Sequence, residues 1–448
     1  MTKDLSTRRV FVGLVFMMSV AAWSRPVVAE DRATHETPRA VNVEEAVETA
    51  LRQNPELKSR EQERATAQGV LLQTGAYPNP ELDLDLETDR FFAGDGEGRR
   101  SIGITQTIVT AGKRGQRQDN ARLGVTMVEQ TVDDAKRRLI AEVEDAFYRL
   151  LFTQERMTFA REQIDLANRL VVLSEGRFRE GFAPEMDVTL AKVEYHTRVQ
   201  ETVALEQELV DARAALNTLM GRAAEELITA QGTLRAAPVV MKQNSALQNE
   251  ALGRRPDLRA LTVESERAEG EVALVRAERV PDLAVSLDVT EERTIFDEPG
   301  LSDSDRLLGV KLSIPLPLFD RKRGELMAAQ SRLRRAESER AALKARIAQE
   351  VHVAVARIAS AEERLHHFEN DVVPLAKNNL DLTRQAYEQG LAGILQIMEA
   401  QRRFAETQLG YLGVQYEHQV ALVALERDIG GRIGGTAPMS RPDEGDGP

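Results

Sequence analysis

The sequence contains no cysteine. That absence excludes a disulfide framework, a thiol nucleophile, a cysteine-based metal site and a lipidated N-terminal cysteine. Aromatic residues are also scarce, at 4% of the 448 residues, which is low for a compact core. Ala, Leu, Glu, Gln and Arg instead dominate long stretches, a composition typical of extended helices and coiled coils. Beyond the N-terminal segment no run approaches about 18 uninterrupted apolar residues, so no membrane-spanning helix is predicted there.

Net positive charge and catalytic motifs are lacking as well. The formal net charge is −13 at pH 7, and so acidic a chain is a poor ligand for nucleic acid. No Ser-His-Asp grouping, phosphate-binding loop or metalloprotease motif stands out. His366 and His367 are adjacent and would project about 100° apart from a helix, and His196, His352 and His418 have no histidine at i+3 or i+4. The sequence therefore predicts no enzyme, no cofactor and no metal site.

The first residues have the features of a secretory signal peptide. A basic start with Arg8 and Arg9, an apolar run that ends near Trp23 and a small-residue cleavage site at Ala29 predict a signal over 1–29. The apolar run is too short for a spanning helix. Export from a Gram-negative cytoplasm is therefore expected, and both the Sec and the twin-arginine route remain open.

The chain carries the same module twice. Pro55 with the acid-leucine pair that follows it recurs at Pro256, an offset of 201, and Lys113 with the following Arg-Gly recurs at Lys322, an offset of 209. A period this long excludes a solenoid, whose units repeat about every 20–50 residues. Each copy is therefore a whole structural half. The predicted organisation is a first repeat at 41–222, a linker at 223–245, a second repeat at 246–430 and a disordered tail at 431–448.

Each half begins with a helix that a proline interrupts and continues with a β-hairpin. Strict alternation of leucine with acidic residues opens the first hairpin, at 80–108, and the second hairpin spans 281–316 around an acidic loop from Phe296 to Arg306. Strands of about ten residues suit a tilted crossing of an outer membrane. Asp83 and Asp85 would then line a wet lumen, because such barrels alternate polar side chains inward with apolar ones outward.

After each hairpin the apolar positions step by four and three residues, which predicts a coiled coil. The predicted helical hairpins span 114–220 and 322–428, each reversing at a short turn that contains glycine. A helix from about Gln116 to Glu175 would be about 90 Å long. In the second copy the apolar seam runs from Ile347 to Val372. A helix of this length is unusual in a single compact domain but is expected in a structure that crosses the periplasm.

These strands and helices cannot be satisfied within one chain. Four amphipathic strands cannot close a barrel, the smallest bacterial barrels have about eight strands, and open sheet edges are not stable in lipid. The apolar helix seams likewise lack a partner large enough to make a closed structure. If the strands lie in a membrane, the chain must therefore oligomerise.

In the order of these signals, repeated twice, the sequence resembles the TolC family of outer-membrane efflux channels over nearly the whole mature chain. The resemblance rests on the paired proline-acid-leucine helix starts, the two hairpins, the Lys-Arg-Gly pairs and the two glycine turns. It implies a mainly α fold with a β-barrel part, in which a homotrimer forms a twelve-stranded outer-membrane barrel that continues into a periplasmic α-helical coiled-coil tube. Ala111–Arg117 and Ile314–Phe319 are most similar to the CzcC-type branch, which is paired with divalent heavy-metal pumps.

The resemblance also implies partners at the two helical turns. Phe178, Gly181, Tyr387 and Gly390 would contact a periplasmic adaptor, or membrane fusion, protein. The adaptor would link the channel to an inner-membrane resistance-nodulation-division pump. Alternatively, these residues only reverse the helices, as any helical hairpin requires.

A periplasmic gate is the second implied site. Asp187, Gln396 and Glu399 are its candidate residues, because carboxylates from three chains at such an entrance would attract cations and resist closing. Gln396 stands where the family has an acid, which weakens such a ring. Glu399 is equally consistent with a solvated acid on a helix.

The predicted function is the outer-membrane channel of a tripartite efflux system, a passive duct for divalent heavy-metal cations. Its predicted location is the cell outer membrane, extending into the periplasm. One alternative is the outer-membrane conduit of a type I protein secretion system, which uses the same fold. Another is a periplasmic coiled-coil scaffold without a pore, against which the alternating strands argue. The exported compound, the pump and the resting state of the duct remain open.

Overall fold

The computed structural model describes residues 38–88, 97–235, 242–295 and 302–433. The predicted signal peptide at 1–29 and residues 434–448 of the predicted tail lie outside the described residues. Among the helices in those ranges, none combines the length and the apolar character needed to cross a bilayer.

The first repeat opens with two capped helices, α1 (Val43–Gln53) and α2 (Pro55–Gly75). The Asn42 side chain accepts a hydrogen bond from the Glu45 amide at 2.8 Å, and the Asn54 side chain accepts one from the Leu57 amide at 2.9 Å. Each bond satisfies an amide that has no partner inside its helix. Pro55, which lacks an N–H, occupies the first position of α2, where none is needed.

The second repeat starts in the same way, with α5 (Asn244–Arg254) and α6 (Pro256–Ala277). Within the predicted linker at 223–245 lies a short strand, β4 (Ile228–Ala230), which pairs in parallel with β1 (Arg39–Val41). Neither strand was predicted, because three residues are too few to show a period. Their pairing joins segments almost 190 residues apart in the sequence.

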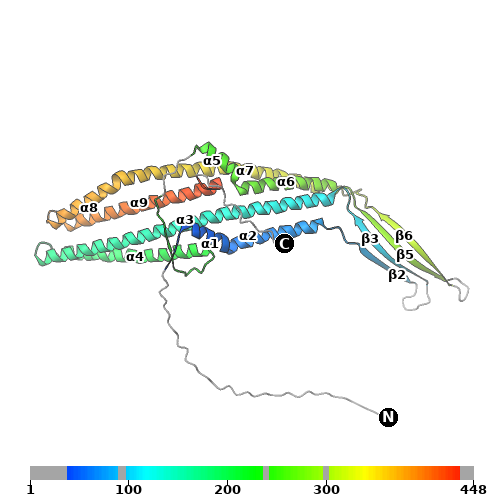
Figure 1. Cartoon of the computed structure of the whole chain (residues 1–448), viewed down its shortest axis with the longest axis horizontal. Coiled ribbons are helices and arrows are strands. Elements are labelled where there is room, and N and C mark those ends of the chain that lie inside the picture. Colours follow the sequence, from blue (N-terminus) through cyan, green and yellow to red (C-terminus); the bar gives the residue numbers. More distant parts are fainter. Residues whose placement is uncertain (1–37, 89–96, 236–241, 296–301, 434–448) are drawn as a thin grey trace, which may run out of the picture. The chain divides into compact units, whose positions relative to one another are not determined.

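The strands of both hairpins form one antiparallel sheet in the order β2-β3-β5-β6 (Figure 1). The strands are β2 (Glu81–Thr88), β3 (Gly98–Ile108), β5 (Leu283–Ile295) and β6 (Ser302–Ser313). They fall within the predicted hairpins at 80–108 and 281–316. The pairing of β3 with β5 joins the two repeats and leaves β2 and β6 as open edges.

The register gives this sheet one apolar and one polar face, because successive side chains of a strand point to opposite sides. One row of the apolar face crosses the strands through Leu84, Ile102, Val289 and Leu308. The neighbouring row on the polar face passes through Asp83, Gly103, Asp288 and Gly309. Most leucines and isoleucines of the apolar face are exposed in a single chain.

The acidic loop predicted from Phe296 to Arg306 is wrong in its second part, because Ser302–Arg306 belong to β6. These residues pair with the end of β5, where the side chains of Glu291 and Arg306 face each other at 3.6 Å. Opposite charges across a strand pair stabilise it, so a charged composition did not prevent a strand here. The remainder of the predicted loop, 296–301, lies outside the described residues.

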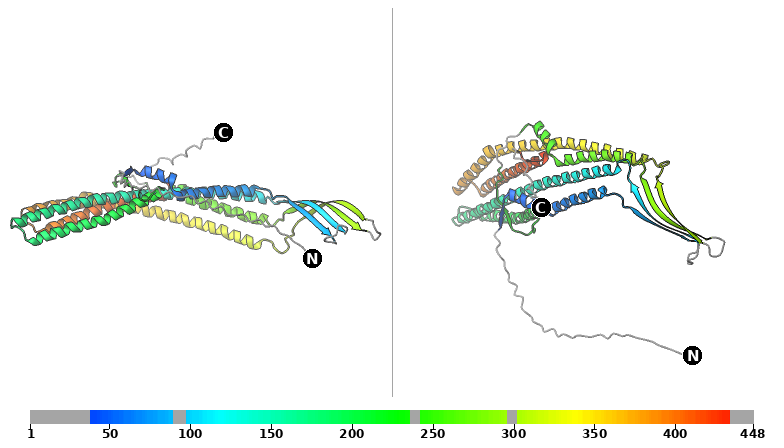
Figure 2. Two further views of the ribbon diagram at one scale, coloured as in Figure 1. Left: turned by 90° about the horizontal axis from the view of Figure 1, so that it is seen from below. Right: turned by 45° about the vertical axis from the view of Figure 1, so that its right-hand side comes forward.

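Each repeat continues as a long antiparallel helical hairpin (Figures 1 and 2). The helices are α3 (Lys113–Arg179), α4 (Glu185–Leu219), α7 (Arg323–His367), α8 (Val373–Glu388) and α9 (Ile394–Ile429). α3 begins close after β3 and has 67 residues, which makes it about 100 Å long. The turn that ends α3 therefore lies far from the sheet. α3 also packs against α6 and α9 of the second repeat.

A π-helical turn, Phe368–Val372, separates α7 from α8 and was not predicted. Pro374 follows it, and a proline inside a helix removes a hydrogen bond and collides with the carbonyl four residues earlier. A π turn is one way in which a helix relieves such a conflict. The turn shifts the helical register, and Val372, predicted to lie in the apolar seam, is 42% exposed.

Part of each predicted seam lies in the buried core of its repeat. In the first repeat the buried cluster includes Val143, Phe147, Leu150, Leu216 and Ala46. In the second it includes Ile347, Val351, Ile358, Leu425 and Leu247. Most of the helix residues in these clusters follow the predicted steps of three and four, so the apolar period alone indicated the packed face of the helices.

Candidate functional site at the helical turns

The first turn, between α3 and α4, is shaped by a glycine in the left-handed conformation. Gly181 has φ +80°, a region that residues with a Cβ rarely adopt. Its amide donates to the Phe178 carbonyl at 3.0 Å, and the Phe182 amide donates to the Arg177 carbonyl at 2.8 Å. These bonds satisfy the last carbonyls of α3, and Pro184 then precedes α4.

The second turn, between α8 and α9, has the same geometry. Gly390 has φ +78°, and its amide donates to the Tyr387 carbonyl at 3.0 Å. The Leu391 amide donates to the Ala386 carbonyl at 2.8 Å. Gln396, a predicted gate residue, accepts a hydrogen bond from the Gly393 amide at 3.0 Å. In this structure the Gln396 side chain therefore caps α9.

One arginine joins the two turns. The Arg177 guanidinium donates to the Tyr387 carbonyl, lies 4.7 Å from the centre of the Tyr387 ring, and comes within 3.4 Å of the place that a Cβ on Gly390 would occupy. Stacking of a cation on an aromatic face adds to the hydrogen bond. Sequence reasoning missed Arg177, since nothing local shows that its partner lies 210 residues away.

Phe178 and Tyr387 correspond to each other in the two repeats but differ in burial. Phe178 is 44% exposed, whereas Tyr387 is 1% exposed and its hydroxyl has no hydrogen-bond partner among the residues that the structure describes. Burial raises the pKa of Tyr387, the Arg177 guanidinium opposes this shift in part, and the Asp187 carboxylate adds to it. Phe178 can therefore touch another molecule directly, while Tyr387 supports the turn from inside.

Several apolar side chains at the turns are exposed that the sequence reasoning did not single out. They are Phe182, Met186, Leu391 and Leu395, each at least 65% exposed. Large apolar groups clustered at an exposed end are a common mark of a protein-protein contact. The sequence feature that could have identified them is their position beside the turn glycines, because solvent-exposed turns usually carry polar residues.

Glu399, the main gate candidate, is paired on its own helix. Its carboxylate accepts from Arg402 Nη2 at 2.5 Å and from Arg403 Nε at 2.7 Å. These hydrogen bonds, from Arg402 first, lower the pKa of Glu399. Asp187 lies in the first turn of α4, where the helix dipole favours a negative charge. The structure thus places two carboxylates beside the turns, one of them already balanced by two arginines.

The acids of the sheet lie on its polar face. Asp83 accepts a hydrogen bond from the Thr105 hydroxyl at 2.5 Å, and Asp85 accepts one from the Ser101 hydroxyl at 3.2 Å. Asp288 lies between Gly103 and Gly309, which leave its carboxylate uncovered by neighbouring side chains on either strand. This face can therefore line an aqueous passage.

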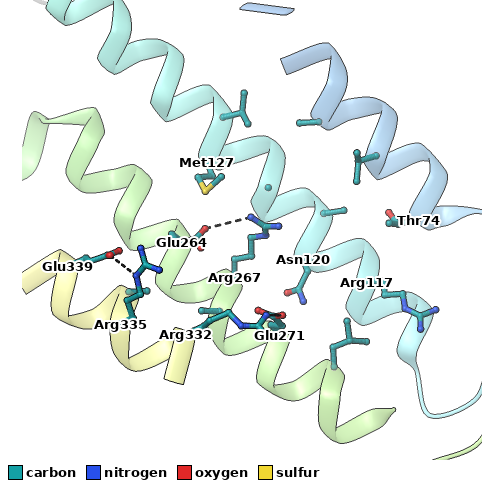
Figure 3. Close-up of a pocket in the computed structure, with 18 residues that line it drawn as sticks. Thr74, Arg117, Asn120, Met127, Glu264, Arg267, Glu271, Arg332, Arg335 and Glu339 are labelled. Carbon is teal, nitrogen blue, oxygen red and sulfur yellow. Dashed lines mark hydrogen bonds and ion pairs between the residues drawn. The ribbon is translucent and has the colours of Figure 1, made fainter. Parts of the chain in front are cut away.

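A cavity of about 740 Å³ lies between α2, α3, α6 and α7 (Figure 3). Arginines and glutamates line it in pairs: Arg335 donates to Glu339 at 2.8 Å, and Arg332 donates to Glu271. Since each of these charges already has an opposite partner, they do not form an ion site. Within the described ranges no group of three or more metal-ligating side chains occurs.

Known families and relatives match the chain along most of its length. The family described as outer membrane efflux protein matches residues 46–222 and 247–431. These two segments correspond to the two repeats.

Two resistance proteins of Cupriavidus metallidurans are similar in sequence. The cobalt-zinc-cadmium resistance protein CzcC is 26% identical over 431 residues, covering 94% of this chain and 100% of CzcC. The nickel and cobalt resistance protein CnrC is 24% identical over 347 residues, covering 77% of this chain and 78% of CnrC. Among solved structures, the outer-membrane channel OprN superposes with a TM-score of 0.73 at 20% identity, covering 87% of this chain and 90% of OprN.

Proposed function

This chain belongs to the outer membrane efflux protein family, and we propose that it is the exit duct of a tripartite pump for divalent heavy-metal cations. As a member of that family it is a passive efflux channel of the outer membrane that extends into the periplasm, and it is not an enzyme. Its duplicated, mainly helical fold is the fold of these channels. Our proposal adds to this the cargo, the adaptor and the pump.

A homotrimer is supported by the sheet. β2 and β6 are open edges of the sheet. In lipid, each unpaired backbone N–H or C=O group at such an edge costs on the order of several kcal/mol. Three chains supply twelve strands, which is enough to close a barrel. The exposed leucines and isoleucines of the apolar face would then contact lipid, and Asp83, Asp85 and Asp288 would face the lumen.

Adaptor contact is supported by the turns. Phe178, Phe182 and Leu391 are exposed apolar side chains around two glycines that fix the shape of the turns. Arg177 and the buried Tyr387 hold the two turns together, so an adaptor would meet them as one surface. Energy for transport would come from the inner-membrane pump, since a passive duct supplies none.

The observation that carries the choice of cargo is the similarity to CzcC along nearly the whole chain. CzcC and CnrC are named for resistance to cobalt, zinc, cadmium and nickel. An acidic chain with carboxylates on the polar sheet face also suits a cation, because charge of one sign along a passage raises the local concentration of counter-ions.

A deletion strain tests the cargo. Without the duct, exported cations would remain in the periplasm, so tolerance to zinc, cobalt and cadmium should fall and return when the intact gene is supplied. Growth is measured ion by ion, with copper and nickel included. Normal tolerance to all five metals would remove the metal assignment, and loss of a secreted protein instead would favour the type I conduit.

Glu399→Ala tests the gate, for which Asp187, Gln396 and Glu399 remain the candidate residues. Removing this carboxylate from three chains leaves Arg402 and Arg403 without their shared partner and makes the entrance less attractive to cations. Single-channel recordings in planar bilayers should show a weaker block by divalent ions and therefore a higher conductance in their presence. Glu417→Ala is the matched control, because Glu417 is an exposed acid of α9 that also pairs with an arginine, Arg364. Conductance and block like those of wild type would take Glu399 out of the gate.

A further inference from the structure

Glu144 of α3 is a buried acid without a hydrogen bond. The residue is 6% exposed, and no donor among the described residues hydrogen-bonds to its carboxylate. The Arg432 guanidinium approaches it, with 3.8 Å between Nη2 and a carboxylate oxygen. A carboxylate that is withdrawn from water and lacks hydrogen bonds is costly in its ionised form, and such a group commonly takes up a proton instead.

This acid lies where the two repeats meet. Next to it on α3, Val143 packs in one buried cluster with Ala46 of α1. Two turns earlier on α3, Arg137 donates to the Arg427 carbonyl of α9, so α9 of the second repeat runs along the same part of α3. The surroundings of Glu144 therefore come from α1 and α3 of the first repeat and from α9 of the second.

The groups around Glu144 are mostly acids. Glu426 of α9 and Glu44 of α1 are close enough for their charges to act on it, Tyr148 lies one turn further along α3, and Arg432 is the cation that acts on it. No group of three or more acids and histidines in the described ranges could hold a metal ion. A proton is then the ion that can reduce the negative charge here.

The pKa values of these groups reflect the crowding of acids in a buried place. Burial raises the pKa of Glu144 to about 7; the Glu426 charge adds to this shift, Arg432 opposes it, and Glu44 adds to it again. Burial also raises the pKa of Glu426, and burial followed by the Glu144 charge raises the pKa of Tyr148. Glu144 therefore gains and loses its proton close to neutral pH.

The corresponding positions of the other repeat do not carry acids. The residue that follows the fully buried core valine of α7, as Glu144 follows that of α3, is His352. On the α9 side of the contact, the counterpart of Glu426 at the offset of 209 is Asn217. The fold of a repeat therefore does not require an acid at either position, and packing alone does not account for the pair.

We propose that Glu144 is a proton-binding site that controls how firmly the two repeats of the chain hold each other at α3 and α9. With the proton in place, the neutral carboxyl packs between α1, α3 and α9. Without it, the carboxylates of Glu144 and Glu426 repel each other across the contact and loosen it. This role concerns the wall of the duct and does not depend on the cargo.

The direction of the pH dependence follows from the pKa shift. Opening the contact exposes Glu144 to water, where its pKa returns to the ordinary value of 4.5. The closed contact binds the proton more tightly, so the stabilisation is present below about pH 4.5 and is lost as the pH rises towards about 7. Between pH 6 and pH 8, the ratio of open to closed contact should therefore rise about tenfold.

Amide hydrogen exchange, followed by mass spectrometry on the intact mature protein in detergent, measures this opening. After correction for the pH dependence of intrinsic exchange, the amides of α1 should open about ten times more often at pH 8 than at pH 6 in wild type. Glu144→Gln, which cannot ionise, should lose most of this dependence and exchange more slowly than wild type at pH 8. Glu142→Gln is the matched control and should follow wild type, because Glu142 is an exposed acid of the same helix.

A second variant tests the same proton without changing Glu144. Glu426→Gln removes the neighbouring charge that raises the pKa of Glu144 most, so the loosening should begin at lower pH and the change between pH 6 and pH 8 should be smaller than in wild type. An opening frequency of α1 that is constant between these pH values in wild type would overturn the proposal. So would a tenfold change that persists in Glu144→Gln, or, where that variant does not fold, one that persists in Glu426→Gln.

Discussion

Replacing Arg255 by alanine is expected to lower the free energy of unfolding by about 3 kcal/mol, at the lower end of the range for breaking a buried ion pair. Arg255 is 4% exposed and donates to Asp257 at 2.6 and 3.0 Å and to Glu350 at 2.5 Å. Without the guanidinium, two carboxylates remain in a largely buried place. Arg137, 3.7 Å from Asp257, compensates only in part.

The loss should depend on pH. Burial by itself would raise the pKa of Asp257, but hydrogen bonds from Arg255 outweigh it and hold the pKa below its usual value. A lowered folded-state pKa stabilises the fold above the unfolded pKa of about 4, and that contribution is lost as the pH falls through the folded value. The difference between the variant and wild type should therefore be full at pH 7 and shrink below about pH 4.

Thermal unfolding in detergent, followed by circular dichroism at pH 7 and below about pH 4, measures this loss of stability. Arg259→Ala is the matched control, since Arg259 lies in the first turn of α6, which Arg255 caps, and its exposed guanidinium donates to the Gly253 carbonyl. Its effect should stay within about 0.5 kcal/mol. Equal destabilisation by the two variants would show that the buried pairing contributes little.

Alanine at Gly221 should destabilise the fold more than alanine at Gly430, although the two glycines correspond in the repeat. Both have left-handed backbones, with φ +70° and φ +76°, and alanine there costs about 1–2 kcal/mol. A Cβ on Gly221 would also lie 2.6 Å from the carbonyl oxygen of Gln53, whereas on Gly430 its nearest neighbour would be Arg254 Cβ at 3.3 Å. Overpacking adds about 1–3 kcal/mol, so we expect about 2–5 kcal/mol at Gly221.

The two variants serve as controls for each other, because they share the backbone conformation and differ in the space around it. Melting temperatures measured side by side should fall by the larger amount for Gly221→Ala. Equal shifts would mean that backbone strain alone determines the cost. A larger shift at Gly430 would contradict the geometry of the contact with Gln53.

Elements with a clear period were predictable from the sequence. The alternating leucines of β2 indicated a two-faced strand, and the steps of three and four in α3 and α7 indicated their buried sides. The pairing of Glu399 with Arg402 and Arg403 was also within reach, since acids three and four residues before arginines interact on a helix. The extent of β6 was not, because its charged first residues become a strand only when β5 lies opposite them.

The site shows the same division. Gly181 and Gly390 were predictable as turn residues, because the reversal of a helix needs a left-handed backbone. The different burial of Phe178 and Tyr387 was not, since the repeat makes them look equivalent. Tyr387 packs in a buried cluster with Leu170 and Ile397 and also contacts Arg177, which approaches the second turn from the first repeat.

By itself, the sequence determined the duplicated architecture, the two faces of the strands, the length of the helices and the family. These properties are encoded by local periods and by two copies of the same signals in the same order. Only the tertiary structure decided that β3 and β5 join the repeats, that β1 pairs with β4, and that Arg177 joins the two turns. Each is a contact between residues far apart in the chain, and no local pattern of side chains specifies the partner of such a contact.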